Sequence, residues 1–102
     1  MKKIKITKIT MPNCPKCNNI ESAWNKVKEN HPEIRFMETD ISRDNDILID
    51  LKRENIYAMP CFMKEIEGKE TVFDCNISGE KDLEAFINEW KRSWKETYLI
   101  CL

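Results

Sequence analysis

Cysteines are the residues of this chain whose type and spacing favour chemistry. Five are present among 102 residues, and Cys14 and Cys17 form the single CxxC pair. Two thiols at this spacing can close a disulfide and react by thiol–disulfide exchange. Pro15 suits the first position of a helix, where free N–H groups and the Lys16 cation would favour a thiolate. We therefore expect Cys14 to be the exposed, attacking thiol and Cys17 to be the buried, resolving thiol.

The rest of the composition excludes several other kinds of site. One histidine excludes HExxH and paired-histidine zinc sites, and two glycines are too few for a GxGxxG loop. A formal net charge of −1 predicts no nucleic-acid or membrane partner. We find no export signal, since Lys5 and Lys8 interrupt the first apolar residues, and no membrane span. An odd number of cysteines then favours a reducing, cytoplasmic location.

Hydrophobic periodicity predicts how the chain positions these cysteines. Alternating residues predict strands, and apolar residues three or four apart predict helices, in the order β-α-β-α-β-β-α. Strands are expected at residues 2–9, 33–39, 60–66 and 70–75, and helices from Cys14 to Asn30, at 44–54 and at 80–96. The first half is a βαβ unit and predicts a parallel strand pair, whereas Gly68 marks a hairpin. We expect a single domain over residues 1–102, with its core at about residues 3–90.

Two motifs together resemble a known superfamily. Residues 10–17, TMPNCPKC, resemble the active-site loop of thioredoxin-fold redox proteins, and residues 54–60, ENIYAMP, resemble the segment before that family's cis-proline. The proline after the first cysteine is closer to the glutaredoxins, and residues 79–83, GEKDL, resemble the start of their last helix. The resemblance covers about residues 3–90. It implies a thioredoxin-like α/β fold, with a four-stranded mixed sheet flanked by three helices.

The resemblance also implies a substrate groove beside the CxxC pair. Pro60 would be cis and would face Cys14 and Cys17, while the backbone of Met59 would pair with a bound thiol substrate as an extra strand. The residues assigned to this groove are Pro15, Lys16, Met59, Pro60 and Cys61.

Several positions depart from the family pattern. Thioredoxins keep a buried carboxylate six residues before the first cysteine, and that position is Lys8 here. We expect Lys8 to be a solvated strand residue. Glutaredoxins carry an aromatic residue where this chain has Lys16, and paired glycines where it has Ser78-Gly79, so glutathione binding has little support from these motifs.

The remaining cysteines leave alternatives open. Cys61 follows the predicted cis-proline and would be a third redox thiol, a ligand with Cys14 and Cys17 for zinc, Cu(I) or an iron–sulfur cluster, or a small apolar group on the opposite sheet face. We favour the packing interpretation. Cys75 is expected to be core or half-buried, and Cys101 to be incidental. The last apolar residues, up to Leu102, are expected to pack on the same monomer.

The function predicted from these observations is thiol–disulfide exchange. The chain would reduce protein disulfides through its CPKC dithiol, in electron transport and cell redox homeostasis, without a cofactor or a metal. Its partners would be a disulfide-bearing protein and either thioredoxin reductase or glutathione as electron donor. The alternatives are a metal-binding or metal-sensing module at Cys14, Cys17 and Cys61, and a redox-inactive binding domain in which the Cys14–Cys17 disulfide never forms.

Overall fold

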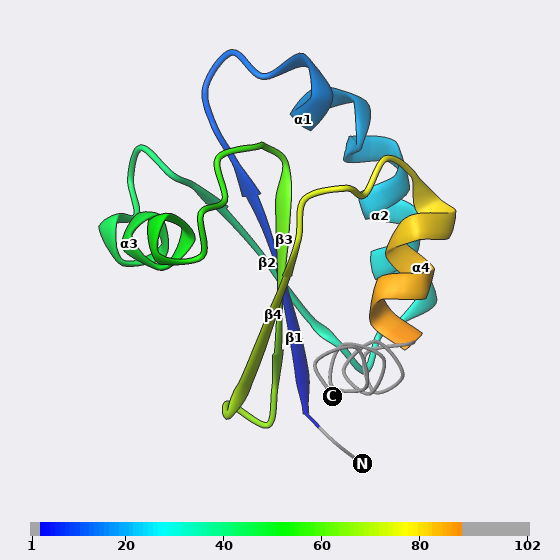
Figure 1. Cartoon of the computed structure of the whole chain (residues 1–102). Coiled ribbons are helices and arrows are strands. Elements are labelled where there is room, and N and C mark those ends of the chain that lie inside the picture. The colour runs from blue at the N-terminus through cyan, green and yellow to red at the C-terminus, as the bar shows by residue number, and fades with distance from the viewer. Residues whose placement is uncertain (1–2, 89–102) are drawn as a thin grey trace, which may run out of the picture.

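A four-stranded mixed sheet forms the centre of the structure, a computed structural model that describes residues 3–88 (Figure 1). The strands are β1 (Ile4–Thr10), β2 (Arg35–Asp40), β3 (Cys61–Ile66) and β4 (Glu70–Asp74). They lie in the order β2-β1-β3-β4. β1 pairs with β2 in parallel and with β3 antiparallel, and β3 pairs antiparallel with β4. The predicted parallel pair and the predicted hairpin are both confirmed.

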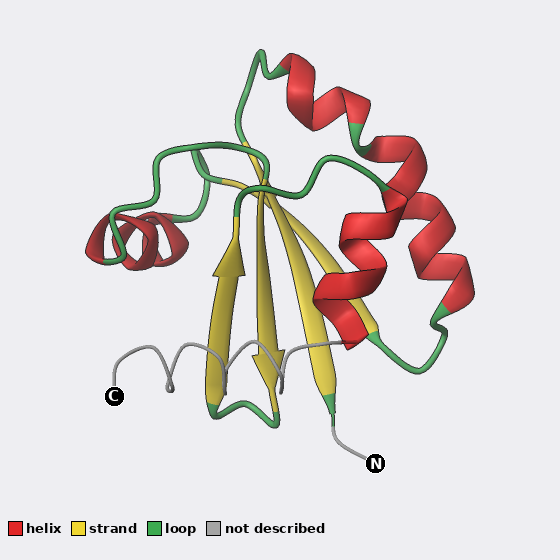
Figure 2. Cartoon of the chain, turned by 45° about the vertical axis from the view of Figure 1, so that its right-hand side comes forward, coloured by secondary structure: helices red, strands yellow, loops and turns green. Residues whose placement is uncertain are grey.

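Helices cover both faces of this sheet. They are α1 (Pro15–Asn19), α2 (Glu21–Asn30), α3 (Asn45–Arg53) and α4 (Glu80–Asn88). Figure 2 shows α1, α2 and α4 on one side of the strands and α3 on the other. The element order predicted from the sequence is confirmed over residues 3–88. Residues 89–96 of the predicted last helix, the apolar tail and Cys101 lie outside the described residues.

The first predicted helix differs in one respect. We expected it to be continuous from Cys14, but it is interrupted at Ile20, which separates α1 from α2. Asn18 and Asn19 precede the break, and asparagine weakens helices because its side chain competes for backbone hydrogen bonds. The CxxC pair therefore lies on a short helical segment of its own.

Local sequence explains the other turns and helix starts. Asp44 caps α3, with its side chain accepting the N–H of Ile47 at 3.1 Å. In the β3–β4 hairpin Glu67 and Gly68 both have positive φ, of 57° and 68°, and glycine adopts such a φ without a steric penalty. The hairpin sets the pairing of β3 with β4 and so determines which residues stand opposite each other near the CxxC pair.

The core consists of two apolar clusters. The α2–α4 cluster is built around Trp24, whose ring meets Phe36 edge-on at 5.3 Å and Phe62 at 5.7 Å. The second, which we call the α3-side cluster, contains Ile9, Cys14, Cys17, Leu51, Met59, Cys61 and Met63. The partly buried Cys75 packs against this cluster, as do four partly buried apolar side chains, one of which is Phe73. The cysteines and methionines of this cluster are therefore part of the packed interior.

Among the helices described between residues 3 and 88, none has the length and apolar composition of a membrane span.

His31, at the end of α2, connects that helix to α4. Its Nε2 lies 2.5 Å from Oε1 of Glu84, and its Nδ1 lies 3.3 Å from Oε2 of Glu33. The hydrogen bond to Glu84 raises the pKa of His31 above 6.5; partial burial opposes the rise, and Glu33 adds to it. A raised folded-state pKa stabilises the fold below the unfolded pKa, and this stabilisation is lost as the pH rises through the folded pKa.

We expect His31→Gln to lower the free energy of unfolding by about 1 kcal/mol near pH 5.5, because the charged hydrogen bond to Glu84 is lost. Near pH 8.5 the difference from the unsubstituted chain should shrink, because the stabilisation from the raised pKa of His31 is lost as the pH rises through the folded-state pKa. Urea denaturation followed by tryptophan fluorescence measures both values. Glu29→Gln, at an exposed position of α2, is the control. An equal loss at both pH values would show that packing, not charge, carries the effect.

Candidate active site

Cys14 and Cys17 are joined in a disulfide at the start of α1. Their Sγ atoms are 2.25 Å apart and their Cα atoms 5.2 Å apart. Cys14 is the extended N-cap residue of α1 and Pro15 occupies the first turn, as the sequence predicts. The backbone N–H of Cys17 donates to Sγ of Cys14 at 3.1 Å. Asn13 turns the chain into this position with a φ of 57°, which asparagine tolerates better than most residues.

The expected difference in burial between the two cysteines is wrong. Both residues are only 5% exposed, so Cys14 is not the open thiol that its position suggested. The bond to Cys17 turns its sulfur toward the α3-side cluster, and Sγ lies 3.9 Å from the carbonyl oxygen of Met59. A disulfide sulfur carries no hydrogen, so in this state the approach is a contact and not a hydrogen bond.

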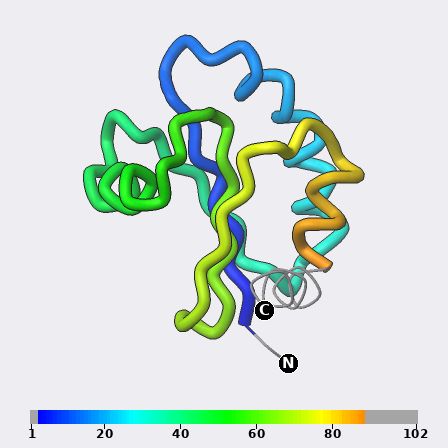
Figure 3. Tube along the Cα trace, viewed as in Figure 1, coloured from blue at the N-terminus to red at the C-terminus, as the bar shows by residue number. Residues whose placement is uncertain are grey.

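Two hollows adjoin the disulfide. The first borders Cys14 itself and is lined by Met11, Cys14, Pro15, Lys16, Tyr57, Ala58 and Met59. The second, of about 340 Å³, is lined by Lys16, Asn19, Ile20, residues 58–60 and residues 75–78. The Met59–Pro60 peptide bond, which is cis, lies where the two meet. Figure 3 shows that the loops after β1, before β3 and after β4 converge at this end of the sheet.

The residues predicted for the groove divide between these hollows and the interior. Pro15, Lys16 and Met59 line the hollow beside Cys14, and Pro60 lines the second. Cys61 lines neither of them, because it is completely buried. The groove therefore contains four of the five predicted residues, together with Met11, Tyr57 and Ala58, which the sequence analysis did not single out. Tyr57 and Met11 are the exposed large apolar side chains of this rim.

Comparisons with known proteins bear on this arrangement. No family model matches the sequence, and no curated protein matches it. Among solved structures, thioredoxin from Fasciola hepatica is similar, with a TM-score of 0.68 and 23% identity over 87% of this chain and 82% of that one. Malaria parasite thioredoxin-2 has a TM-score of 0.70 and 12% identity, over 86% and 84%. Thioredoxin from Malassezia sympodialis has a TM-score of 0.65 and 21% identity, over 85% and 74%. The chain has the thioredoxin fold.

Cys61 of this thioredoxin-fold chain does not reach the surface. It is 0% exposed and belongs to the α3-side cluster that also contains Cys14 and Cys17. It therefore packs as a small buried group on the α3 side of the sheet, the face opposite to the one that α1, α2 and α4 cover, as the packing interpretation predicts. Burial raises the pKa of the Cys61 thiol to about 12, and the neighbouring Cys75 and Asp74 add to the rise.

The metal alternative finds no support in the geometry of the described residues. Within residues 3–88 no three histidine, cysteine or acidic side chains are grouped so that they could hold a metal ion. Cys14 and Cys17 are bonded to each other, and a disulfide offers no thiolate ligand.

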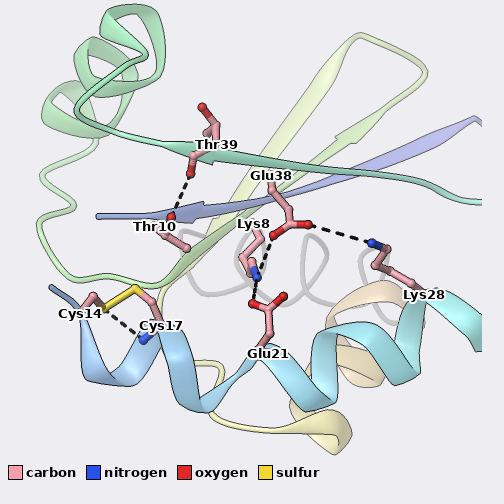
Figure 4. A network of polar contacts seen from close by, with 8 residues as sticks. All are labelled: Lys8, Thr10, Cys14, Cys17, Glu21, Lys28, Glu38 and Thr39. Atoms are coloured by element: carbon pink, nitrogen blue, oxygen red, sulfur yellow. Dashed lines mark hydrogen bonds and ion pairs between the residues drawn. A yellow bond between two sulfur atoms is a disulfide. The ribbon is translucent and has the colours of Figure 1, made fainter. Parts of the chain in front are cut away.

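Lys8 is the largest departure from the sequence-based expectation. We expected a solvated strand residue, but the side chain is 2% exposed. Its Nζ forms ion pairs with Glu21 and with Oε1 of Glu38, the latter at 3.0 Å (Figure 4). The same Nζ lies 5.4 Å from the centre of the Trp24 ring. The alternation of side chains along the strand indicates this burial, because Lys8 falls on the same inward face as Ile6.

Two exposed carboxylates make this burial tolerable. Glu21 and Glu38 remain about half exposed, at 50% and 49%, so their charges reach water while neutralising the buried ammonium group. Burial by itself would raise the pKa of Glu38, but the hydrogen bond and charge of Lys8 outweigh it and lower the pKa below 4.5. Lys28 contributes a further, weaker attraction at 4.0 Å.

This arrangement predicts that removing both carboxylates destabilises the fold more than removing the lysine charge does. The double variant Glu21→Gln/Glu38→Gln leaves the Lys8 ammonium group buried without its counter-charges, and we expect a loss of about 2 kcal/mol of unfolding free energy. Lys8→Met keeps the packing volume and leaves carboxylates that water can solvate, so the loss should be about half as large. Urea denaturation at neutral pH measures both. Lys5→Met, at a partly exposed position of the same strand, is the control. A larger loss for Lys8→Met would contradict this account.

Proposed function

We propose that this chain is a thiol–disulfide oxidoreductase that reduces protein disulfides through Cys14 and Cys17. The observation that carries the proposal is a reversible type of bond, the disulfide, placed at a helix start and bordering a surface groove. Solved thioredoxins share the fold and so support the assignment. The rival interpretation of a redox-inactive domain requires that this disulfide never forms, and the bond between the two sulfurs favours the oxidoreductase instead.

The reaction proceeds in two exchanges. In the reduced chain the Cys14 thiolate attacks one sulfur of a substrate disulfide, and the other substrate sulfur leaves as a thiol. Cys17 then gives up its proton and attacks Cys14, which releases the second substrate thiol and closes the disulfide seen in the structure. Two electrons pass from the dithiol to the substrate. The N–H of Cys17, 3.1 Å from Sγ of Cys14, is placed to stabilise the attacking thiolate.

The groove indicates the shape of the substrate. Met11, Tyr57 and Ala58 form an exposed rim around Cys14, which suits an extended peptide with an apolar side chain next to its disulfide. The backbone of Met59 lies against Sγ of Cys14 and would pair with that peptide as an added strand.

The same proposal includes the compartment and the electron donor. Cys61 and Cys75 are free thiols in the structure, which suits the reducing conditions of the cytoplasm. Thioredoxin reductase or glutathione would return the two electrons, and no organic cofactor is needed because the dithiol itself carries them. Comparing the rates at which each donor reduces the Cys14–Cys17 disulfide identifies the donor.

Reduction of insulin with dithiothreitol as electron source tests the assignment. Cys14→Ser should lower the rate by at least about a hundredfold, because it removes the nucleophile. Cys17→Ser should also lose turnover but should accumulate a covalent mixed disulfide through Cys14, visible by mass spectrometry. Insulin reduction by Cys14→Ser at the rate of the unsubstituted chain would refute the proposed function.

A second variant tests the groove. Tyr57→Ala should raise KM for a protein disulfide about fivefold, the equivalent of about 1 kcal/mol of lost contact, because the ring is 73% exposed on the rim. The rate with bis(2-hydroxyethyl) disulfide, which is too small to reach the rim, should be unchanged. Ile49→Ala removes another exposed apolar side chain, 53% exposed on α3, and is the control. Equal effects of Tyr57→Ala on both substrates would contradict a role in protein recognition.

A further inference from the structure

Cys61 and Cys75 stand opposite each other at the end of the β3–β4 hairpin. The antiparallel register pairs Met63 with Phe73 and Phe62 with Asp74. β4 ends at Asp74, and continuing the same register by one residue beyond it brings Cys75 opposite Cys61. Directly opposed residues of an antiparallel pair have Cβ atoms about 4.5–5.5 Å apart, close to the separation of about 3.5–4.5 Å in a disulfide.

The two thiols also face the same side of the sheet. Cys61 is part of the α3-side cluster, and Cys75 packs against that cluster next to Phe73. The charge of Cys75 contributes to the raised pKa of Cys61, and the backbone of Asp74, the neighbour of Cys75 in the chain, acts on it in the opposite direction. The Cys61 sulfur therefore lies toward the segment that carries Cys75.

The thiols of Cys61 and Cys75 differ sharply in their exposure to solvent. Cys61 is 0% exposed. Cys75 is only partly buried and lines the hollow of about 340 Å³ together with Pro60, Asn76 and Ser78. A small molecule in this hollow can reach Cys75 but not Cys61, so one thiol is placed to react first and the other to react second.

We propose that Cys61 and Cys75 are a second, regulatory dithiol, which closes to a cross-strand disulfide when a low-molecular-weight disulfide enters the hollow. The Cys75 thiolate attacks the small disulfide, forms a mixed disulfide and releases one small thiol. Cys61 then loses its proton and attacks the Cys75 sulfur, which releases the second small thiol. The two protein thiols lose two electrons, and the small disulfide is reduced to two thiols.

The new bond would alter the groove of the proposed oxidoreductase. Pro60 precedes Cys61 and Asn76 follows Cys75 in the chain. Both line the hollow of about 340 Å³, which shares Lys16, Ala58 and Met59 with the hollow that borders Cys14. Closing Cys61 to Cys75 ties these two walls together. Its regulatory effect rests on the proposed function, whereas the closing of the Cys61–Cys75 bond requires no reaction at Cys14 or Cys17.

The test isolates the pair in the full chain with Cys14, Cys17 and Cys101 replaced by serine. Incubation with bis(2-hydroxyethyl) disulfide should remove both remaining thiols and join the tryptic peptides 54–64 and 70–81 within a single monomer, as read by mass spectrometry. Free thiols at both positions, or a mixed disulfide that stays on Cys75, would overturn the proposal. If the serine variant does not fold, the unsubstituted chain is treated and digested in the same way. The same link between peptides 54–64 and 70–81 is then expected.

A matched pair of variants tests the order of the two attacks. In the serine background, Cys61→Ala should leave Cys75 trapped as a mixed disulfide with hydroxyethanethiol. Cys75→Ala should leave Cys61 unreacted in the folded chain, although it reacts after unfolding in urea. The reverse pattern would contradict the assigned order. Failure of insulin reduction alongside successful closure of Cys61 to Cys75 would remove the proposed function and leave this inference standing.

Discussion

The position of β1 between two partner strands is the constraint on which the rest of the structure depends. Its backbone pairs with β2 on one edge and with β3 on the other, and helices cover both of its faces. The strand ends at Thr10, so the loop that follows carries Cys14 to the end of the sheet where β3 begins. The CxxC pair therefore meets Met59 and Pro60 because β1 and β3 run antiparallel side by side.

The four cysteines within residues 3–88 belong to, or pack against, one apolar cluster. Cys14, Cys17 and Cys61 are all buried there, and Cys75 packs against its edge. Burial keeps the thiol of Cys61 protonated, with a pKa of about 12, whereas the N–H of Cys17 is aimed at the sulfur of Cys14. One apolar cluster therefore contains both a thiol whose pKa is raised by burial and a disulfide sulfur that accepts a backbone N–H.

Buried lysines show how this small core tolerates charge. Lys8 is neutralised by carboxylates that stay in contact with water, and its stem lies against Trp24. Lys64, on β3, instead donates to the carbonyl oxygen of Phe86 in α4, and burial lowers its pKa to about 8. In both cases the aliphatic stem fills core volume while the ammonium group finds an oxygen acceptor.

The sequence by itself determined the element order, the hairpin at Gly68 and the place of the CxxC pair at a helix start, because these follow from local periodicity, turn chemistry and the proline at position 15. It also contained the inward face that Lys8 shares with Ile6. Only the tertiary structure decided that Cys14 is buried and that Cys61 faces Cys75, because burial and cross-strand register depend on contacts between segments far apart in the chain.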